Sequence, residues 1–359
     1  MNRPSLGQLF EERANNFNLI RVLAALAVIY GHAGAITGQG PADFFLRSVG
    51  HKFIGGVAVD VFFVLSGFLI TSSALSQRGL AYYATSRLLR IYPALIVCVL
   101  LSVFLLGPAL TTLDLGAYFH SRQSWVYLWQ NMTAWKTQYE LPGVFLTNRD
   151  HAVNGSLWSL AVEVRLYIIV LVFLWAGLLT RRSAFNTVFA LIMAISLARP
   201  EVWTPLIQYD NHRDVTLMFL IGAFMWVNRN DIPMNPAVAV LLLLFASALH
   251  KTPYFGLAYT LALPYFVFVA AYLPGLSWFN RAGDYSYGIY LYGWPCQQLA
   301  LMWWPTSSNL ANTAQSSLMA FSMALLSWHL IEQPAMGLKK RLLRSTTAAA
   351  PTTLTAESK

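Results

Sequence analysis

The chain has 359 residues, of which 57% are hydrophobic and only 11% are charged. Such a composition cannot cover a soluble globule with a polar surface, so we expect a membrane protein. The formal charge of +9 does not indicate nucleic-acid binding, because Lys and Arg are spread over the loops and do not gather on one amphipathic face.

Apolar runs long enough to cross a bilayer recur along the chain with little polar sequence between them. They predict an all-α fold, a polytopic membrane bundle of about ten transmembrane helices. In chain order, the predicted helices cover residues 18–37, 54–75, 90–112, 156–178, 184–198, 214–228, 236–250, 255–273, 285–304 and 312–331.

An even number of spans places both termini on the same side of the membrane. If that side is the cytoplasm, the inner segments hold more Lys and Arg than the outer ones, as the positive-inside rule requires. The longest connection, residues 113–155, then faces outward and is rich in Trp and Tyr. It is either a functional loop or an aromatic segment that lies on the headgroups, and the sequence does not decide between them.

Five ionisable residues of the predicted helices stand out, because a charge near the centre of the bilayer costs at least about 2.5 kcal/mol. A residue in such a position needs a partner, a wet cavity or a function. The five are Arg21, His32, Asp60, Glu163 and Arg165. The two cysteines, also in predicted spans, have no metal-ligand spacing, so we expect neither a metal site nor a disulfide.

Helical geometry groups these residues. Arg21 and His32 are eleven residues apart, which places them on one face of a helix about 16 Å apart. His32, Asp60 and Glu163 each lie about five to seven residues from the outer end of their helix, which predicts a common depth. A carboxylate beside an imidazole would orient it as a general base. The alternatives are a core histidine bonded to a carbonyl and carboxylates that only join two helices.

Arg87 and Arg90 stand three residues apart at the mouth of the third helix, close to where Arg21 emerges. Three guanidiniums at one rim suit the phosphates of a donor molecule. Cationic residues that flank a span are an equally good explanation.

Six sequence blocks carry a resemblance to a known family. Taken together, in this order and spacing, they are specific, whereas each alone is weak. They are NLIRVLAALAVIYGH, GGVAVDVFFVLSGFLI, RLLRIYP, NGSLWSLAVEVRLY, DYSYGIYLYGWP and LIEQPAMGLKKRL. With these blocks the chain resembles the acyltransferase-3 family of membrane acyltransferases, which modify cell-surface glycans such as lipopolysaccharide O-antigen and exopolysaccharide.

The resemblance implies that Arg21 and His32 are essential and that Arg87 and Arg90 serve the use of acyl-coenzyme A. Three departures limit what carries over: Val164 replaces a second acidic residue, Gly293 a histidine, and Ala58 a glycine. We also expect a bacterial inner-membrane protein, whose termini the positive-inside rule places in the cytoplasm. We expect the membrane domain to cover residues 1–345 and a disordered cytoplasmic tail to follow at 346–359.

The resulting hypothesis is acyl transfer from cytoplasmic acyl-coenzyme A, in the first place acetyl-coenzyme A, to a hydroxyl of a glycan or lipid-linked glycan. Arg21, Arg87 and Arg90 would bind the donor, and His32, with Asp60 and Glu163, would carry the chemistry. An acyl-histidine intermediate and direct transfer both remain open. The alternative function is a proton-coupled transporter or exporter, in which the same residues would form a proton relay.

Overall fold

The computed structural model describes residues 3–12, 14–40, 43, 46–47, 52–76, 78–203 and 210–339. Within these ranges the chain forms helices and connecting loops and no named β-strand. Each of the ten ranges predicted to be helical falls on a helix. The tail at 346–359, predicted to be disordered, lies outside the described residues.

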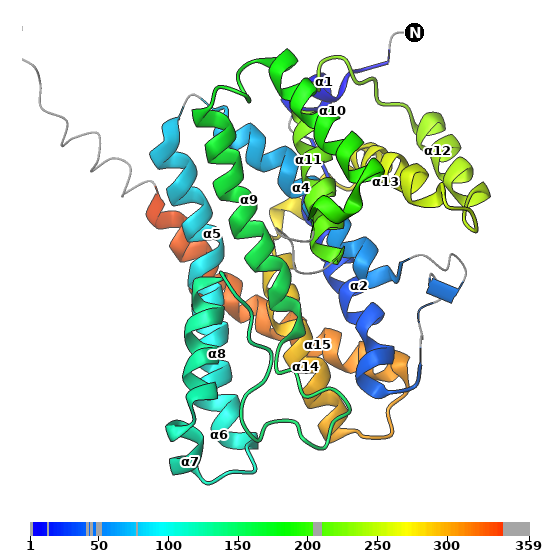
Figure 1. Ribbon diagram of the computed structural model, residues 1–359. Coiled ribbons are helices and arrows are strands. Elements are labelled where there is room, and N and C mark those ends of the chain that lie inside the picture. Colours follow the sequence, from blue (N-terminus) through cyan, green and yellow to red (C-terminus); the bar gives the residue numbers. More distant parts are fainter. Residues whose placement is uncertain are drawn as a thin grey trace, which may run out of the picture.

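The helices form one bundle with a side lobe made by α12 and α13 (Figure 1). Two short π-helical stretches, Ser102–Leu106 and Trp328–Glu332, continue α5 and α15. The principal helices are α1 (Leu6–Glu11), α2 (Phe17–Thr37), α4 (Ile54–Ala74), α5 (Gly79–Leu101), α6 (Gly107–Leu110), α7 (Leu115–His120), α8 (Arg122–Thr133), α9 (Trp158–Trp175), α10 (Arg182–Ala198), α11 (Asp210–Val227), α12 (Pro236–Ala248), α13 (Phe255–Ala271), α14 (Ser286–Trp303) and α15 (Asn309–Ser327).

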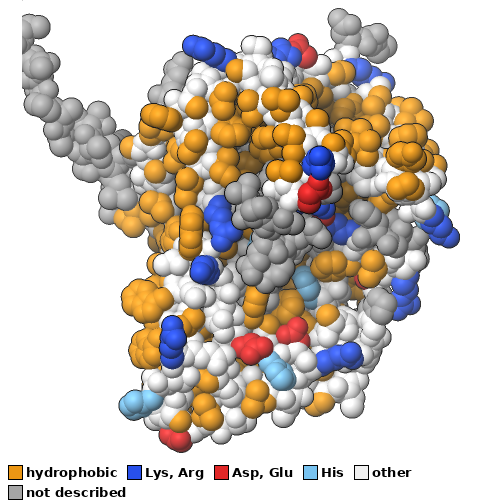
Figure 2. Space-filling model, viewed as in Figure 1, with side chains coloured by type: hydrophobic (Ala, Val, Ile, Leu, Met, Phe, Trp, Pro, Cys, Tyr) orange, Lys and Arg blue, Asp and Glu red, His pale blue; other side chains and the backbone are white. Residues whose placement is uncertain are grey.

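Four helical segments of the described chain are long and apolar enough to cross a membrane. They are Phe17–Thr37, Ile54–Ala74, Gly79–Leu110 and Gly155–Trp175. The number of about ten spans therefore stays a prediction. Hydrophobic side chains cover much of the outside of the bundle (Figure 2). Among the large ones, Trp175 is 90% exposed and Leu330 is 71% exposed. Such a surface is suited to lipid and supports a membrane protein.

The long connection after α6 contains two helices, α7 and α8, at the end of the molecule opposite α1 (Figure 1). Trp129 and Trp135 in this segment are 63% and 52% exposed. The hydroxyl of Tyr118 donates to the carbonyl of Val103, which ties α7 to the π-helical end of α5. The segment is thus ordered and carries exposed indoles, which suits both interpretations drawn from the sequence.

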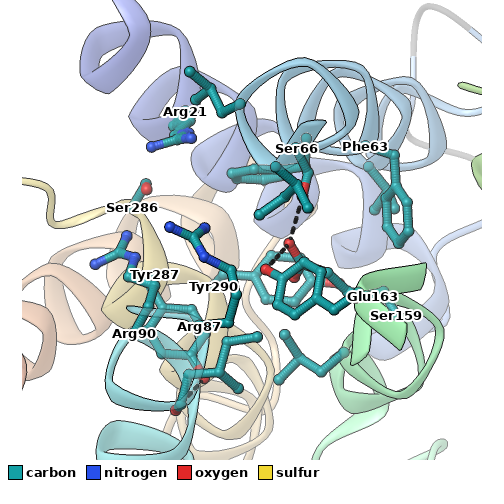
Figure 3. Close-up of a pocket in the computed structure, with 17 residues that line it drawn as sticks. Arg21, Phe63, Ser66, Arg87, Arg90, Ser159, Glu163, Ser286, Tyr287 and Tyr290 are labelled. Carbon is teal, nitrogen blue, oxygen red and sulfur yellow. Dashed lines mark hydrogen bonds between the residues drawn. The ribbon is translucent and has the colours of Figure 1, made fainter. Parts of the chain in front are cut away.

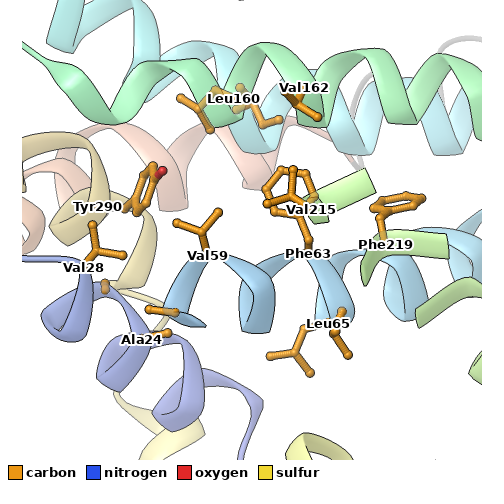
Figure 4. Close-up of a cluster of buried hydrophobic side chains, with 14 of the residues drawn as sticks. Ala24, Val28, Val59, Phe63, Leu65, Leu160, Val162, Val215, Phe219 and Tyr290 are labelled. Atoms are coloured by element: carbon orange, nitrogen blue, oxygen red, sulfur yellow. The ribbon is translucent and has the colours of Figure 1, made fainter. Parts of the chain in front are cut away.

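Helix α4 lies at the centre of the bundle, and its side chains meet those of α2, α9, α11 and α14 in one apolar core (Figure 4). Two glycines allow it to approach α11 closely. A Cβ on Gly67 would lie 1.9 Å from the carbonyl oxygen of Phe219, and one on Gly222 would lie 2.1 Å from that of Val64. Small residues at a helix crossing let the two backbones touch, which fixes the position of the polar side chains on α4.

Candidate functional site

The three predicted donor-binding arginines line one cavity of about 100 Å³ (Figure 3). We call it the arginine pocket. Arg21 comes from α2, Arg87 and Arg90 come from α5, and Glu163 enters from α9. The structure therefore brings together residues that are far apart in the sequence. The pocket is also lined by Ser66, Tyr167, Ser159, Ser286, Tyr287 and Tyr290.

Two of these arginines belong to a buried ionic network. The carboxylate of Asp284 accepts from Arg21 at 3.2 Å and from Arg90 at 2.6 Å, and Arg90 also reaches Glu332 at 3.2 Å. Burial opposes ionisation of Asp284, which lies before α14, but Arg90 and Arg21 hold the pKa of its carboxyl below the usual range. Ser327 donates to the second oxygen of Glu332. The charges of Arg21 and Arg90 are therefore compensated by carboxylates of the protein itself.

Arg87 differs from the other two arginines. Its Nε is buried, and no described residue accepts a hydrogen bond from it. Its guanidinium lies 5.9 Å from the centre of the Tyr167 ring, at the range of a cation–π contact. A buried donor that the surrounding protein leaves unsatisfied is costly, so a ligand acceptor at this position would gain the full strength of the bond. Arg87 is thus the best placed of the three to bind an anion.

Glu163 lies with the arginines and away from His32. Its Oε1 accepts from the hydroxyl of Ser66 and from that of Tyr167, both at 2.7 Å. Ser66 is six residues beyond Asp60 on α4, which places Glu163 about 9 Å further along that helix. Glu163 therefore lies in the arginine pocket and not beside His32, whereas a common depth of His32, Asp60 and Glu163 in a membrane stays a prediction. Counting residues from helix ends does not show which helices cross, because side-chain packing decides that.

His32 lines a second cavity of about 160 Å³, which we call the histidine pocket. Its Nδ1 lies 2.7 Å from the carbonyl oxygen of Val28, one turn earlier on α2. In the neutral ring this contact requires a proton on Nδ1, which leaves Nε2 as the nitrogen that can accept one. The rings of Phe53 and Trp294 pack edge-on against the imidazole at 5.2 and 4.9 Å. The geometry holds His32 in the tautomer that a general base needs.

The sequence predicted that Asp60 orients the imidazole, but in the structure Asp60 contacts other residues. It is fully buried, its two oxygens accept from Nζ of Lys52 at 2.9 and 2.7 Å, and Tyr259 donates to Oδ2 at 2.6 Å. Because α4 begins immediately after Lys52 and Phe53, the lysine folds back over the first turns of the helix and reaches Asp60. The main-chain carbonyl of Val28 takes the orienting role that the sequence assigned to a carboxylate.

The arginine and histidine pockets adjoin. Val59 of α4 and Tyr290 of α14 line both cavities and so form the wall between them. Ser159 shares a hydrogen bond of 2.6 Å with the hydroxyl of Tyr290, which also donates to the carbonyl of Ser156 at 3.1 Å. A group held in one pocket is therefore only one side chain away from the other.

Three charged residues of the site were missed in the sequence: Lys52, Asp284 and Glu332. Each lies just outside a predicted helix, where a charge is unremarkable by itself. Asp284 and Glu332 do fall in two of the blocks that carry the family resemblance, and that was the available signal. Arg165 contacts the carbonyl of Trp135 at 2.6 Å and joins α9 to the outer connection.

A helical membrane protein that encloses charged and polar pockets between its helices is the class that this fold and site define. Comparison with known proteins then specifies it. A profile described as an acyltransferase domain, that of the acyltransferase-3 family, matches residues 15–332. Since the match covers most of the sequence, the chain belongs to the acyltransferase-3 family.

Relatives agree with this assignment. The chain is 27% identical over 343 residues to an O-acetyl transferase of Shigella phage Sf6, covering 89% of this chain and 96% of that protein. It is 27% identical over 369 residues to nodulation protein 10 of Rhizobium leguminosarum, covering 92% and 95%. A third relative is the peptidoglycan O-acetyltransferase OatA of Listeria monocytogenes, 30% identical over 162 residues, or 42% of this chain and 22% of OatA. No solved structure matches the chain.

Proposed function

We propose that the protein is a membrane-embedded O-acyltransferase that moves an acyl group from cytoplasmic acyl-coenzyme A to a hydroxyl of a cell-surface or exported glycan. The observation that carries the proposal is the shared wall between the two pockets. A pocket lined by three arginines suits the donor, and a histidine with a free Nε2 next to it suits the transfer. Family membership and the O-acetyl transferase relatives favour this function over a transporter.

On the donor side, Arg87 supplies a guanidinium that no described carboxylate pairs with, and Arg21 and Arg90, which pair with Asp284 and Glu332, line the same pocket. Their positions suit a phosphate of coenzyme A, whose pantetheine arm would extend past Val59 and Tyr290 toward His32. Arg21 and His32 are separated by about 16 Å along α2, close to the length of an extended pantetheine. Acetyl-coenzyme A is the donor that best fits the relatives' names. Membrane lipid would surround the helices.

In the transfer step, Nε2 of His32 takes the proton of an acceptor hydroxyl while its oxygen attacks the thioester carbonyl carbon. The C–S bond then breaks, and coenzyme A leaves as a thiolate that takes the proton back from the imidazolium. An acyl-histidine intermediate is compatible with the same geometry. Glu163 lines the arginine pocket with Arg87, and Asp60 binds the ammonium of Lys52. Neither carboxylate is assigned a direct role at the imidazole.

The acceptor is proposed from the relatives. One of them is named as a peptidoglycan O-acetyltransferase. Peptidoglycan is a glycan, so a glycan hydroxyl is the acceptor that this name favours. A glycan or lipid-linked glycan would enter from the outer side, with the enzyme in the bacterial inner membrane and both termini in the cytoplasm.

The test is acyl transfer by purified protein in lipid nanodiscs with radiolabelled acetyl-coenzyme A and a glycan extract from the source strain. We expect His32→Ala to abolish label transfer and release of free coenzyme A while it stays folded. The matched control is His120→Ala, because His120 makes the same contact to a carbonyl four residues earlier but is exposed. Full activity in His32→Ala would refute the mechanism, and glycan movement across the membrane of proteoliposomes without thioester cleavage by the wild type would establish a transporter.

A further inference from the structure

Lys52 lines the histidine pocket together with His32, yet neither its chemistry nor its position in a loop singled it out in the sequence. Its side chain is 16% exposed, whereas its partner Asp60 is completely buried. Two hydrogen bonds from Nζ to the two oxygens of Asp60 fix the ammonium. Tyr259 in turn fixes Asp60 from the other side. The cation is therefore held in one place by a buried carboxylate.

The packing of α2 against α4 places the start of α4, which Lys52 precedes, beside the helix that carries the histidine. A Cβ on Gly31 would lie 2.5 Å from the backbone nitrogen of Gly55, so the start of α4 is pressed against α2 one residue before His32. A Cβ on Gly56 would lie 3.0 Å from Cε and from Cγ of Lys52. Gly31 thus makes room for the backbone of α4, and Gly56 makes room for the lysine side chain.

The ammonium has one N–H donor that Asp60 does not use. A Lys side chain has three N–H donors, and two of them are used by Asp60. Among the described residues, the other charged neighbours are Asp214, whose Oδ2 lies 3.9 Å from Nζ, and Arg213, which pairs with Asp214. Lys52 also borders a larger cavity of about 430 Å³ between α10, α11 and α13, so the ammonium lies between two cavities.

We propose that Lys52 is a catalytic residue that stabilises the oxyanion formed during acyl transfer. This proposal rests on the proposed function. When the acceptor oxygen bonds to the thioester carbon, the carbonyl π electrons move to the carbonyl oxygen, and the third N–H of Lys52 donates to it. As the C–S bond breaks, those electrons return to re-form the carbonyl, and the sulfur leaves as a thiolate. A fixed donor of this kind needs no reorganisation during the reaction, and its loss typically costs about 100- to 1,000-fold in kcat.

The experiment must separate catalysis from folding, because Lys52→Met alone leaves Asp60 buried without its cation. The informative protein is the double variant Lys52→Met with Asp60→Asn, which removes both charges. We expect it to fold and to show kcat lowered about 100-fold or more, with KM for acetyl-coenzyme A within about threefold of the wild type. Lys251→Met, which removes an exposed lysine from the connection between α12 and α13, is the matched control and should keep full activity.

A double variant that turns over acetyl-coenzyme A at the wild-type rate would overturn the role of Lys52. A double variant that loses affinity for the donor, with kcat unchanged, would also overturn it, because an oxyanion donor acts in the transition state. The proposed function fails in a different way: the wild-type protein itself would then release no coenzyme A in the presence of the glycan. The two failures are therefore distinguished in one set of assays.

Discussion

The hydroxyl of Ser66 donates a hydrogen bond of 2.7 Å to the carboxylate of Glu163, which joins α4 to α9 at the arginine pocket. A polar contact between two apolar helices has few competing partners, so its effect should be measurable. A double-mutant cycle of Ser66→Ala and Glu163→Gln should give a coupling energy of about 1 kcal/mol in thermal or denaturant unfolding in detergent. A coupling energy indistinguishable from that of Ser66→Ala with the distant, exposed Asp231→Asn would contradict this.

Replacing Arg87 tests donor binding more cleanly than replacing Arg90, because Arg90 also holds Asp284 and Glu332. Arg87→Gln should raise KM for acetyl-coenzyme A about tenfold or more, since a charge-assisted hydrogen bond contributes about 1.5–3 kcal/mol. Steady-state kinetics in nanodiscs provide the measurement. The control is Arg78→Gln, an exposed arginine earlier on the chain that contacts Tyr82. An unchanged KM in Arg87→Gln would exclude phosphate binding by this residue.

Asp284→Asn should destabilise the fold strongly, because Arg21 and Arg90 then face each other without the carboxylate between them. Removing one partner of a buried ion pair costs about 3–5 kcal/mol. The melting temperature of the purified protein is the measurement. Asp231→Asn provides the comparison, since its pair with Arg182 is 58% and 55% exposed and should contribute little. Equal melting temperatures for the two variants would show that the network does not stabilise the protein.

The same carboxyl predicts a pH dependence. The pKa of Asp284 is lowered in the folded protein, so the unfolded chain binds more protons there. Its contribution to stability is therefore complete above the unfolded value of about 4 and is lost as the pH falls through the lower folded value. Unfolding of wild type and Asp284→Asn between pH 7 and pH 3 should show the difference between them shrink in acid. A constant difference would contradict the prediction.

Gly67→Ala should prevent the close crossing of α4 and α11. Its new methyl would lie 1.9 Å from a main-chain oxygen, which can move away only if the helices separate. We expect the free energy of unfolding to fall by about 3 kcal/mol or more, or the protein to fail to fold. Size-exclusion chromatography and thermal unfolding provide the measurement. Gly337→Ala meets nothing within 4 Å and should be neutral or slightly stabilising. A wild-type melting temperature for Gly67→Ala would show that the crossing is looser than it is here.

The sequence by itself determined the helices and the chemistry available to them. Apolar runs of helical length can form little else, so each predicted range became a helix. The cost of a charge in an apolar helix singled out Arg21, His32, Asp60 and Glu163. Their spacing along one helix also placed Arg21 and His32 on the same face, because helical rise and turn are local properties.

The tertiary structure alone decided which of these residues are neighbours. Glu163 lies with the arginines because α9 meets α4 at Ser66. The position of this contact depends on helix packing and cannot be obtained by counting residues. Asp60 pairs with Lys52 because Gly55 and Gly56 leave room for Phe53 and Lys52 over the start of α4. Asp284 and Glu332 lie in the site because helix ends that look solvent-exposed in the sequence are buried by other helices. Helix contacts of this kind depend on side-chain shape over long chain separations, which no local pattern encodes.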